Sequence, residues 1–286
     1  MNKLKHNRLL SFVVISIVYV LATICAIKVY NSLNYSWWIS LLLADVVATI
    51  FTFIFSLIFA NASVYDPYWS VQPPVILIAF AFINKLNLFS IILLIVVCFW
   101  AIRLTANWAY GFLNLNHQDW RYTMLNQKTG SFYPIINFVG IHMVPTLIVY
   151  ACTLPAVYAI LNNLSVTPLS IVCLCISLGA ATMQGIADIQ MHKFRKHRDG
   201  KFIRNGLWKY SRHPNYLGEI LMWWGVGLAV VFAKLDAWFL IFGAISNTLL
   251  FLFVSIPMAD GRQSKKQGFD QYKSQTRMLL PIKKFH

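Results

Sequence analysis

Long apolar runs recur along this chain and constrain its fold more than any other feature. A helix of about 20 apolar residues crosses the hydrocarbon core of a bilayer, and in lipid the backbone must satisfy its own hydrogen bonds. The sequence therefore predicts an all-α fold, a polytopic membrane helical bundle of about eight transmembrane helices. The predicted spans are 9–30, 37–60, 75–84, 88–113, 138–161, 169–190, 216–232 and 238–257, of which 75–84 is short and open to a re-entrant interpretation.

The distribution of charge along the chain indicates how the chain is oriented in the membrane, and it does not favour a nucleic-acid partner. The formal net charge is +15, a value also seen in nucleic-acid-binding proteins. Here the basic residues gather before the first run, in 193–212 and at the C-terminal end. By the positive-inside rule these segments face the cytoplasm, which places both termini there. We expect contact with membrane lipids, no nucleic acid, and a bacterial inner membrane, or the endoplasmic reticulum in a eukaryote.

Polar residues divide the chain into two parts without a linker between them. The segment 9–60 has few polar groups and is predicted to form peripheral helices of a single integral membrane domain, 1–286. From residue 61 onward, polar residues gather at helix ends on the predicted cytoplasmic side. Four such segments on one side predict a single polar cavity within the bundle, and they are 61–72, 103–122, 184–195 and 204–219. The five cysteines show no metal-ligand spacing, so no metal is expected.

One predicted helix carries a polar face that continues out of the membrane. Gln184, Asp188, His192 and Arg195 are spaced by four, four and three residues, which places them on the same face. A carboxylate and an amide at this depth suit the hydroxyl and amino groups of a nucleoside, and Arg195 suits a phosphate. The alternative is structural, with Arg195 reaching the interface and Asp188 paired to an arginine.

The polar run 209–220 contains Glu219, the only glutamate in the sequence. A carboxylate at membrane depth is costly and marks a functional site by default. Pro214 suits the first turn of a helix, and the free N–H groups there favour an anion. Arg212 and His213 flank this position and are candidates to hold a pyrophosphate. Asn215 and Glu219 lie one turn apart on the same helix face.

The same region carries a family resemblance. The segment 206–220, GLWKYSRHPNYLGEI, is followed by Trp224 and Gly225 and resembles the C-terminal signature of the steroid 5-alpha-reductase-like membrane enzymes. The ending, FDQY at 269–272, is similar to the close of that family. The nearest likeness is to its uncharacterised bacterial-type members, through YDPYWS at 65–70 and DWRY at 119–122. The resemblance covers 61–286, which is thus expected to be a reductase-like catalytic bundle.

The resemblance implies NADPH as cofactor and an activated carbon–carbon double bond in a lipophilic substrate as the acceptor. Gln184 stands where the steroid enzymes have asparagine, and Arg103 stands where they have a tyrosine. The resemblance and the anion site next to Pro214 together give the predicted cofactor-binding residues. They are Gln184, Asp188, Arg195, Arg212, His213, Asn215, Tyr216 and Glu219.

Reduction of an enone also needs a group that donates a proton and stabilises the developing oxyanion. A tyrosine hydroxyl or a protonated carboxyl in a dry cavity can serve. The candidate catalytic residues are Asp66, Tyr65, Tyr68 and Tyr110. The tyrosines are also typical of an interfacial aromatic belt.

Two more polar residues lie inside apolar runs, and both favour structural roles. Asp45 is alone in the second run, and we expect an interhelical hydrogen bond there. His142 is expected to be a packed, hydrogen-bonded histidine.

Two competing functions remain open at the level of sequence. The segment 212–218, RHPNYLG, is also similar to the motif of membrane isoprenylcysteine and phospholipid methyltransferases, which bind S-adenosylmethionine. Those enzymes carry paired glutamates downstream, where this chain has only Asp260 and Asp270. The other possibility is a lipid-binding or scaffolding membrane protein without catalysis.

Overall fold

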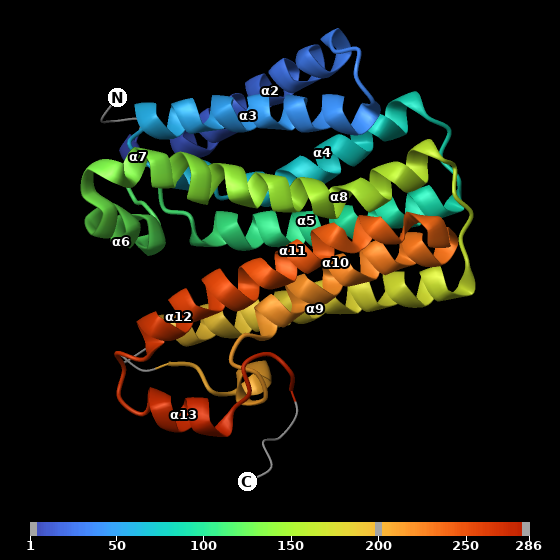
Figure 1. Ribbon diagram of the computed structural model, residues 1–286. Helices are drawn as coiled ribbons and strands as arrows, with labels where there is room; N and C mark the ends of the chain where they lie inside the picture. The colour runs from blue at the N-terminus through green and yellow to red at the C-terminus, as the bar shows by residue number, and fades with distance from the viewer. Residues whose placement is uncertain (1–4, 198–201, 282–286) are drawn as a thin grey trace. The chain divides into compact units, whose positions relative to one another are not determined.

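The described parts of this chain, residues 5–197 and 202–281 of a computed structural model, are helical and contain no strand (Figure 1). The chain divides into two compact units. The first unit comprises Met1–Pro73 and Trp108–Tyr150, and the second comprises Pro74–Asn107 and Ala151–His286. The boundaries fall within helices α4, α5 and α8, and each unit is described by itself.

The first unit is built on α2 and α3, which lie side by side (Figure 1). Asn7 caps the start of α2, where its side-chain oxygen accepts a hydrogen bond from the backbone N–H of Leu10 at 3.0 Å. The other elements of this unit follow the chain. They are α2 (Arg8–Ser32), α3 (Trp37–Ile58), η1 (Ala62–Val64), the start of α4 (Tyr68–Ile83), the end of α5 (Leu88–Gly111), α6 (Trp120–Thr129), η2 (Gly130–Phe132), α7 (Tyr133–Ile136), the π-helix η3 (Asn137–Met143) and the start of α8 (Val144–Leu161).

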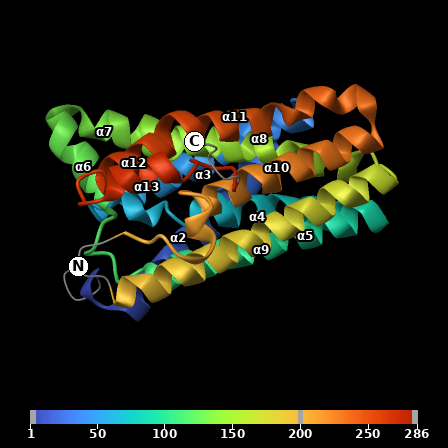
Figure 2. The ribbon, with the colours of Figure 1, turned by 90° about the horizontal axis from the view of Figure 1, so that it is seen from below.

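The second unit is built on the long pair α9 and α10, which run side by side in Figures 1 and 2. Each begins with a proline, Pro168 or Pro214, which has no N–H to leave unpaired in a first turn. The elements that this unit adds are α9 (Pro168–Lys196), η4 (Gly206–Lys209), α10 (Pro214–Ala233), η5 (Leu235–Ile241), α11 (Phe242–Leu250), the π-helix η6 (Phe251–Ser255), α12 (Ile256–Gln263) and α13 (Phe269–Gln275).

Two glycines of α10 let α9 approach closely. A Cβ at Gly218 would lie 2.7 Å from the carbonyl oxygen of Ala180, and one at Gly225 would lie 2.6 Å from that of Cys173. Small residues at such crossings allow membrane helices to pack backbone against backbone. This contact fixes where the polar side chains of α9 and α10 meet.

Most of the predicted spans are helices of suitable length. Seven helical segments of the described residues are long and apolar enough to cross a membrane, and they correspond to seven of the eight predicted runs. The remaining run, 75–84, lies in α4, whose 16 residues rise only about 24 Å. The all-α membrane fold is therefore supported, while the count of eight and the side of each terminus stay predictions.

Parts of the four polar segments contact one another inside each unit. In the first unit, Asn61 donates from its side chain to the carbonyl oxygen of Leu115 at 2.7 Å, and Ser63 Oγ accepts from the N–H of Asp119 at 2.9 Å. In the second unit, Arg103 meets Asp188 and Glu219. A single cavity formed by all four segments, and a single domain over 1–286, stay predictions.

Candidate functional site

Glu219 is the centre of a buried polar cluster in the second unit. Its Oε2 accepts hydrogen bonds from Trp100 Nε1 at 2.9 Å and from Gln184 Nε2 at 2.6 Å. Its Oε1 accepts one from Trp223 Nε1, one turn along α10, at 3.0 Å. The residue is 7% exposed. Both carboxylate oxygens are thus occupied by donors from α5, α9 and α10.

An ion pair adjoins this carboxylate. Arg103 Nη1 of α5 lies 2.7 Å from Asp188 Oδ2 of α9, and Arg103 Nη2 lies 4.0 Å from Glu219 Oε2. Both side chains of the closer pair are 13% exposed. One guanidinium therefore serves two carboxylates. The structural alternative for Asp188, a pair with an arginine, is present with Arg103.

Four atoms of this cluster are buried and have no hydrogen-bond partner. They are Arg103 Nε, Arg103 Nη2, Gln184 Oε1 and Asn215 Oδ1. Gln184 connects them, because its Nε2 also reaches the carbonyl oxygen of Asn215 at 3.2 Å. Buried polar atoms are nearly always paired, so unpaired ones call for an explanation such as a bound ligand or water. The cluster offers two N–H groups and two amide oxygens to such a ligand.

The other residues of the polar face of α9 lie farther along the helix. His192 Nε2 is 2.7 Å from Asn107 Oδ1 of α5. Arg195 is exposed near the end of α9, about 10 Å beyond Asp188 along the helix axis. All four predicted residues are helical as expected. Gln184 and Asp188 join the Glu219 cluster, whereas Arg195 lies beyond it, and its contact with a cofactor stays a prediction.

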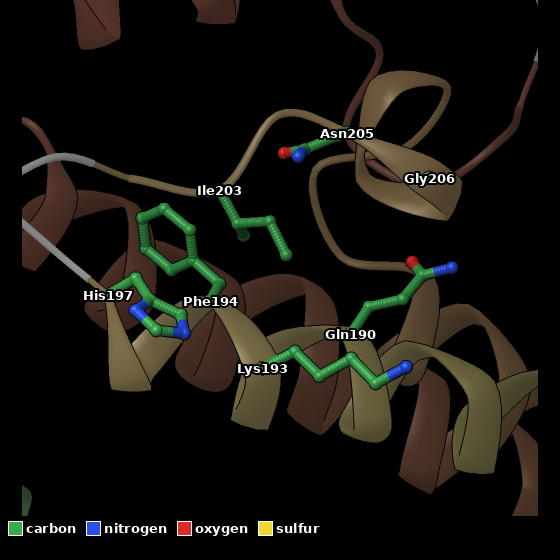
Figure 3. Close-up of a pocket in the computed structure, with 7 residues that line it drawn as sticks. All are labelled: Gln190, Lys193, Phe194, His197, Ile203, Asn205 and Gly206. Carbon is green, nitrogen blue, oxygen red and sulfur yellow. The ribbon is translucent and has the colours of Figure 1, made fainter.

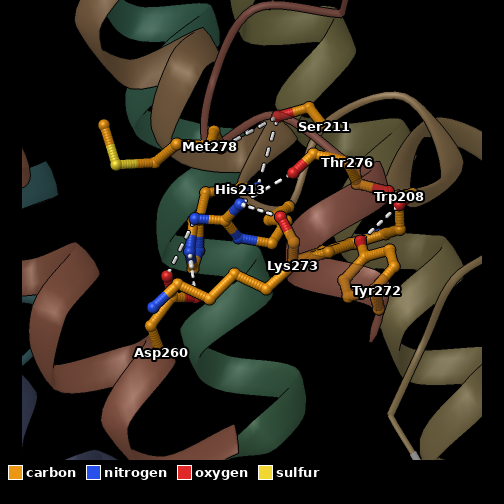
Figure 4. Close-up of polar contacts among 9 residues, drawn as sticks. Trp208, Ser211, His213, Asp260, Tyr272, Lys273, Thr276 and Met278 are labelled. Carbon is orange, nitrogen blue, oxygen red and sulfur yellow. Dashed lines mark hydrogen bonds and ion pairs between the residues drawn. The ribbon is translucent and has the colours of Figure 1, made fainter. Parts of the chain in front are cut away.

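Arg212 and His213 bind an acid rather than flank an open anion site (Figure 4). Arg212 Nη2 lies 3.0 Å from Asp260 Oδ2, and His213 Nε2 lies 2.9 Å from Asp260 Oδ1. Arg212 Nη1 also donates to the carbonyl oxygen of Thr276 at 2.7 Å. These bonds connect the start of α10 to α12 and to the segment after α13. Both side chains are almost fully buried. Arg212 Nε is buried without a hydrogen-bond partner, and contact of either residue with a pyrophosphate stays a prediction.

Tyr216 belongs to an aromatic stack at the same end of α10. Its ring is stacked on that of His213, with centroids 5.2 Å apart and planes 3° apart, and it lies 4.9 Å from the ring of Phe251 in the π-helix η6. This position holds His213 towards Asp260. A direct contact between Tyr216 and a cofactor stays a prediction.

All four candidate proton donors lie in the first unit, and three of them are close to one another in sequence. The Tyr65 hydroxyl and Thr146 Oγ1 are 2.7 Å apart, and Thr146 Oγ1 is 2.9 Å from Thr49 Oγ1. Tyr68 donates to Asp45 Oδ1 at 2.7 Å. The rings of Tyr65 and Tyr68 are stacked, with centroids 5.1 Å apart. Both tyrosines are buried, so they meet the requirement for a dry environment.

The hydrogen bonds expected for Asp45 and His142 are present. Asp45 accepts from Tyr68 and, at 2.8 Å, from Gln72 Nε2, both on α4. His142 is fully buried in η3, and its Nδ1 lies 3.0 Å from the carbonyl oxygen of Asn137. Its ring lies 4.5 Å from that of Tyr65. The interhelical bond of Asp45 holds the α4 tyrosine in place.

Asp66 occupies the turn before α4 and is partly buried. Its Oδ1 accepts a hydrogen bond from the Tyr122 hydroxyl at 2.5 Å. Burial raises the pKa of Asp66 to about 6, and the positive charge of Arg121 opposes this shift. A carboxyl with such a pKa exchanges a proton near neutral pH, as a proton donor must. Tyr110, by contrast, is 57% exposed near the end of α5, and its role as a proton donor stays a prediction.

Substitution of Asp66 by asparagine is expected to flatten the pH dependence of stability between about pH 4 and pH 6. Because its folded pKa is about 6 and the unfolded value is about 3.9, the folded state holds the proton more tightly. The contribution of Asp66 to the free energy of unfolding therefore falls as pH rises through this interval. Thermal unfolding in detergent at a series of pH values measures the slope. The exposed Asp270 provides the matched control, Asp270→Asn, and an unchanged slope in Asp66→Asn would contradict the raised pKa.

Comparison with known proteins places the chain in a family. A family model described as "Protein of unknown function (DUF1295)" matches residues 52–276. The chain belongs to this family. It is also 26% identical over 191 residues to "Uncharacterized protein C594.04c" of Schizosaccharomyces pombe. That match covers 57% of this chain and 56% of the relative, so the chain spans little more than half the length of the curated relative. No solved structure matches the chain.

The DUF1295 region contains every residue of the Glu219 cluster, including Arg103 and Trp100, which the sequence does not assign to it. The signal in the sequence for Arg103 is its position as a cation within an otherwise apolar helix, which requires a buried acid nearby. No comparable signal marks Trp100, because an indole in a membrane helix is ordinary.

Proposed function

We propose that this DUF1295 protein is an NADPH-dependent membrane oxidoreductase that reduces an activated carbon–carbon double bond of a lipophilic substrate. The resemblance of 206–220 to the steroid 5-alpha-reductase-like enzymes supports this class. The observation that carries the proposal is the set of buried polar atoms without a hydrogen bond around Glu219, on Arg103, Gln184 and Asn215, in helices long enough to cross a membrane.

The residues of the cluster fit a nicotinamide nucleotide. The two amide oxygens of Gln184 and Asn215 are acceptors for hydroxyl or amide N–H groups, and Arg103 Nε and Nη2 are donors for a carbonyl, hydroxyl or phosphate oxygen. When bound, NADPH supplies the hydride. Asp188 and Glu219 hold the guanidinium of Arg103 in place, and the indoles of Trp100 and Trp223 exclude water. Arg212 and His213 are assigned a positioning role through Asp260.

Tyr65 is the proposed proton donor to the substrate, with Tyr68 and Asp66 as the other candidates. The Tyr65 hydroxyl is bonded to Thr146, which is bonded to Thr49. The Tyr65 oxygen therefore belongs to a chain of three buried hydroxyl groups. Asp66, with its pKa of about 6, suits the exchange of protons with solvent at the end of the membrane helices.

One observation favours the S-adenosylmethionine-dependent methyltransferase as the second candidate. The Glu219 cluster has two carboxylates to one guanidinium, and the rings of Trp100 and Trp223 meet edge to face with centroids 4.9 Å apart. An excess of acid beside indole rings suits a sulfonium cation. The paired glutamates of those enzymes are still missing from this sequence.

Thermal unfolding with added cofactors distinguishes the two functions. The purified protein in detergent is titrated with NADPH, NADH and S-adenosylmethionine, and the midpoint of unfolding is recorded for each. We expect NADPH to raise the midpoint more than the other two compounds, because a ligand that binds only the folded state stabilises it by mass action. Stabilisation by S-adenosylmethionine alone would replace the reductase with the methyltransferase. Membranes with NADPH and a lipid extract then identify the reduced substrate.

Substitution of Asn215 by alanine is expected to weaken the binding of NADPH while leaving the stability of the free protein almost unchanged. The change removes a buried oxygen that has no partner, so the free protein should lose little stability. If Asn215 Oδ1 accepts a hydrogen bond from the cofactor, the Kd for NADPH should rise about fivefold to tenfold. Glu219→Gln is less informative, because its amide nitrogen would face an N–H donor of Trp100, Trp223 or Gln184.

The matched control for this prediction is Asn162→Ala, at an exposed asparagine whose side chain donates to the carbonyl oxygen of Tyr158, one turn earlier. It should leave the Kd for NADPH unchanged. An Asn215→Ala protein with wild-type affinity for NADPH would remove Asn215 from the cofactor site.

A further inference from the structure

A second polar site lies in the second unit, at the end of α9. A pocket of about 380 Å³ falls in the size range of small-ligand sites. Its walls are the last turns of α9 and the segment before η4 (Figure 3). The side chains that line it are Gln190, Lys193 and Phe194 from α9 and His197 directly after it, with Ile203 and Asn205 from the other wall. None of these residues belongs to the Glu219 cluster.

Local structure holds the two walls together. Gln190 Oε1 accepts a hydrogen bond from the backbone N–H of Leu207 at 2.9 Å. Gly206 has a φ of 61°, and a Cβ there would lie 2.5 Å from the Gln190 side chain. A glycine is therefore needed for this turn. The pocket is thus bounded at one end by the hydrogen bond between Gln190 and the backbone of Leu207.

The pocket has apolar side chains at its centre and basic or amide side chains around its edge. Figure 3 shows Phe194 and Ile203 next to each other, with Asn205 on the same wall as Ile203. Lys193 in the last turn of α9 and His197 directly after the helix are both exposed. No acidic side chain is among the described residues that line the pocket. Such a rim attracts an anion, and the apolar centre suits a ligand that also has an apolar part.

The position of the pocket identifies the anion. α9 is one of the segments able to cross a membrane, and its last turn carries Lys193, Arg195 and Lys196. The basic end of a spanning helix lies at the level of the lipid headgroups. Basic pockets beside transmembrane helices at this level suit phosphate headgroups of anionic lipids.

We propose that this pocket binds the headgroup of an anionic phospholipid, with the phosphate against Lys193 and His197, the glycerol end against Phe194 and Ile203, and the amides of Gln190 and Asn205 on the headgroup hydroxyls. The proposal is independent of the reductase function, because it uses no residue of the Glu219 cluster and requires no nucleotide.

Binding of short-chain phosphatidylglycerol to the full chain in a neutral detergent tests the proposal. The Kd is taken from thermal stabilisation at increasing lipid concentration, beside phosphatidylcholine of the same chain length, inorganic phosphate and NADPH. We expect stabilisation by phosphatidylglycerol well below the concentrations at which phosphatidylcholine or inorganic phosphate acts. Lys193→Gln should weaken phosphatidylglycerol binding about fivefold, and Lys193→Gln/His197→Gln should weaken it further.

The matched control is Lys209→Gln, at an exposed lysine on η4 that does not line the pocket. It should bind phosphatidylglycerol as the wild type does, and the surface position of all three side chains keeps the unliganded fold intact. Equal lipid affinity in the Lys193→Gln/His197→Gln protein would overturn the proposal. So would equal stabilisation by inorganic phosphate, or a loss of NADPH affinity in this variant without any loss of lipid affinity.

Discussion

Replacing Arg103 by methionine is expected to lower the free energy of unfolding by about 3 to 5 kcal/mol. The guanidinium of Arg103 pairs with Asp188 and also lies 4.0 Å from Glu219. The side chains of Arg103 and Asp188 are each 13% exposed. Methionine fills much of the same volume but leaves two carboxylates in the membrane-spanning helices without this counter-charge. Denaturation of the detergent-solubilised protein, followed by circular dichroism, measures the loss.

Two further variants show whether the loss comes from the unpaired acid. Arg103→Met/Asp188→Leu removes both members of the pair and should recover a large part of the lost stability, because a buried ion pair can often be replaced by apolar side chains at little cost. Arg204→Met changes an exposed arginine and should have almost no effect. If the double variant is no more stable than Arg103→Met, the pair with Asp188 does not explain the role of Arg103.

Substitution of Gly243 by alanine is expected to destabilise the second unit by about 3 kcal/mol, the upper part of the range for overpacking. A Cβ at Gly243 on α11 would lie 2.4 Å from the backbone carbon and oxygen of Ala151 and 2.4 Å from the backbone nitrogen of Cys152. Backbone atoms cannot rotate away as a flexible side chain can, so one helix must shift. The same denaturation experiment measures this loss.

Gly179→Ala is the matched control for this prediction. Gly179 lies inside α9, and a Cβ there would meet nothing within 4 Å. The alanine variant should be as stable as the wild type or more stable by about 0.5 to 1 kcal/mol, because glycine is unfavourable within a helix. A Gly243→Ala protein that behaves like Gly179→Ala would mean that α11 and α8 do not approach closely enough for their backbones to touch.

The Glu219 cluster shows where sequence reasoning succeeds. Gln184 and Asp188 are one turn apart, as are Asn215 and Glu219, and each pair lies on one face of its own helix. That Glu219 needs buried partners also follows from the sequence, because a lone glutamate at membrane depth is costly unless it is paired. What the periodicity of a helix cannot give is the identity of the partner. Trp100 is 119 residues from Glu219, and Arg103 is 85 residues from Asp188.

Arg212 and His213 show what the same reasoning leaves out. Their position before Pro214 fits an anion site at a helix N-terminus, and the local pattern contains nothing against it. The acid that occupies both side chains is Asp260, which lies 48 residues from Arg212 in sequence. A local motif can show that a cation is available but not whether another part of the chain has already neutralised it.

The amino-acid sequence by itself determined the class of this protein, the position of nearly all its membrane helices and the buried acids that need partners. These depend on the length of apolar runs and on the spacing of polar residues along one helix. Only the tertiary structure decided which helix faces meet. It placed Arg103 and Trp100 beside the acids and set Asp260 against Arg212, because packing between helices depends on close approach at residues such as Gly218 and Gly225, which no local pattern encodes.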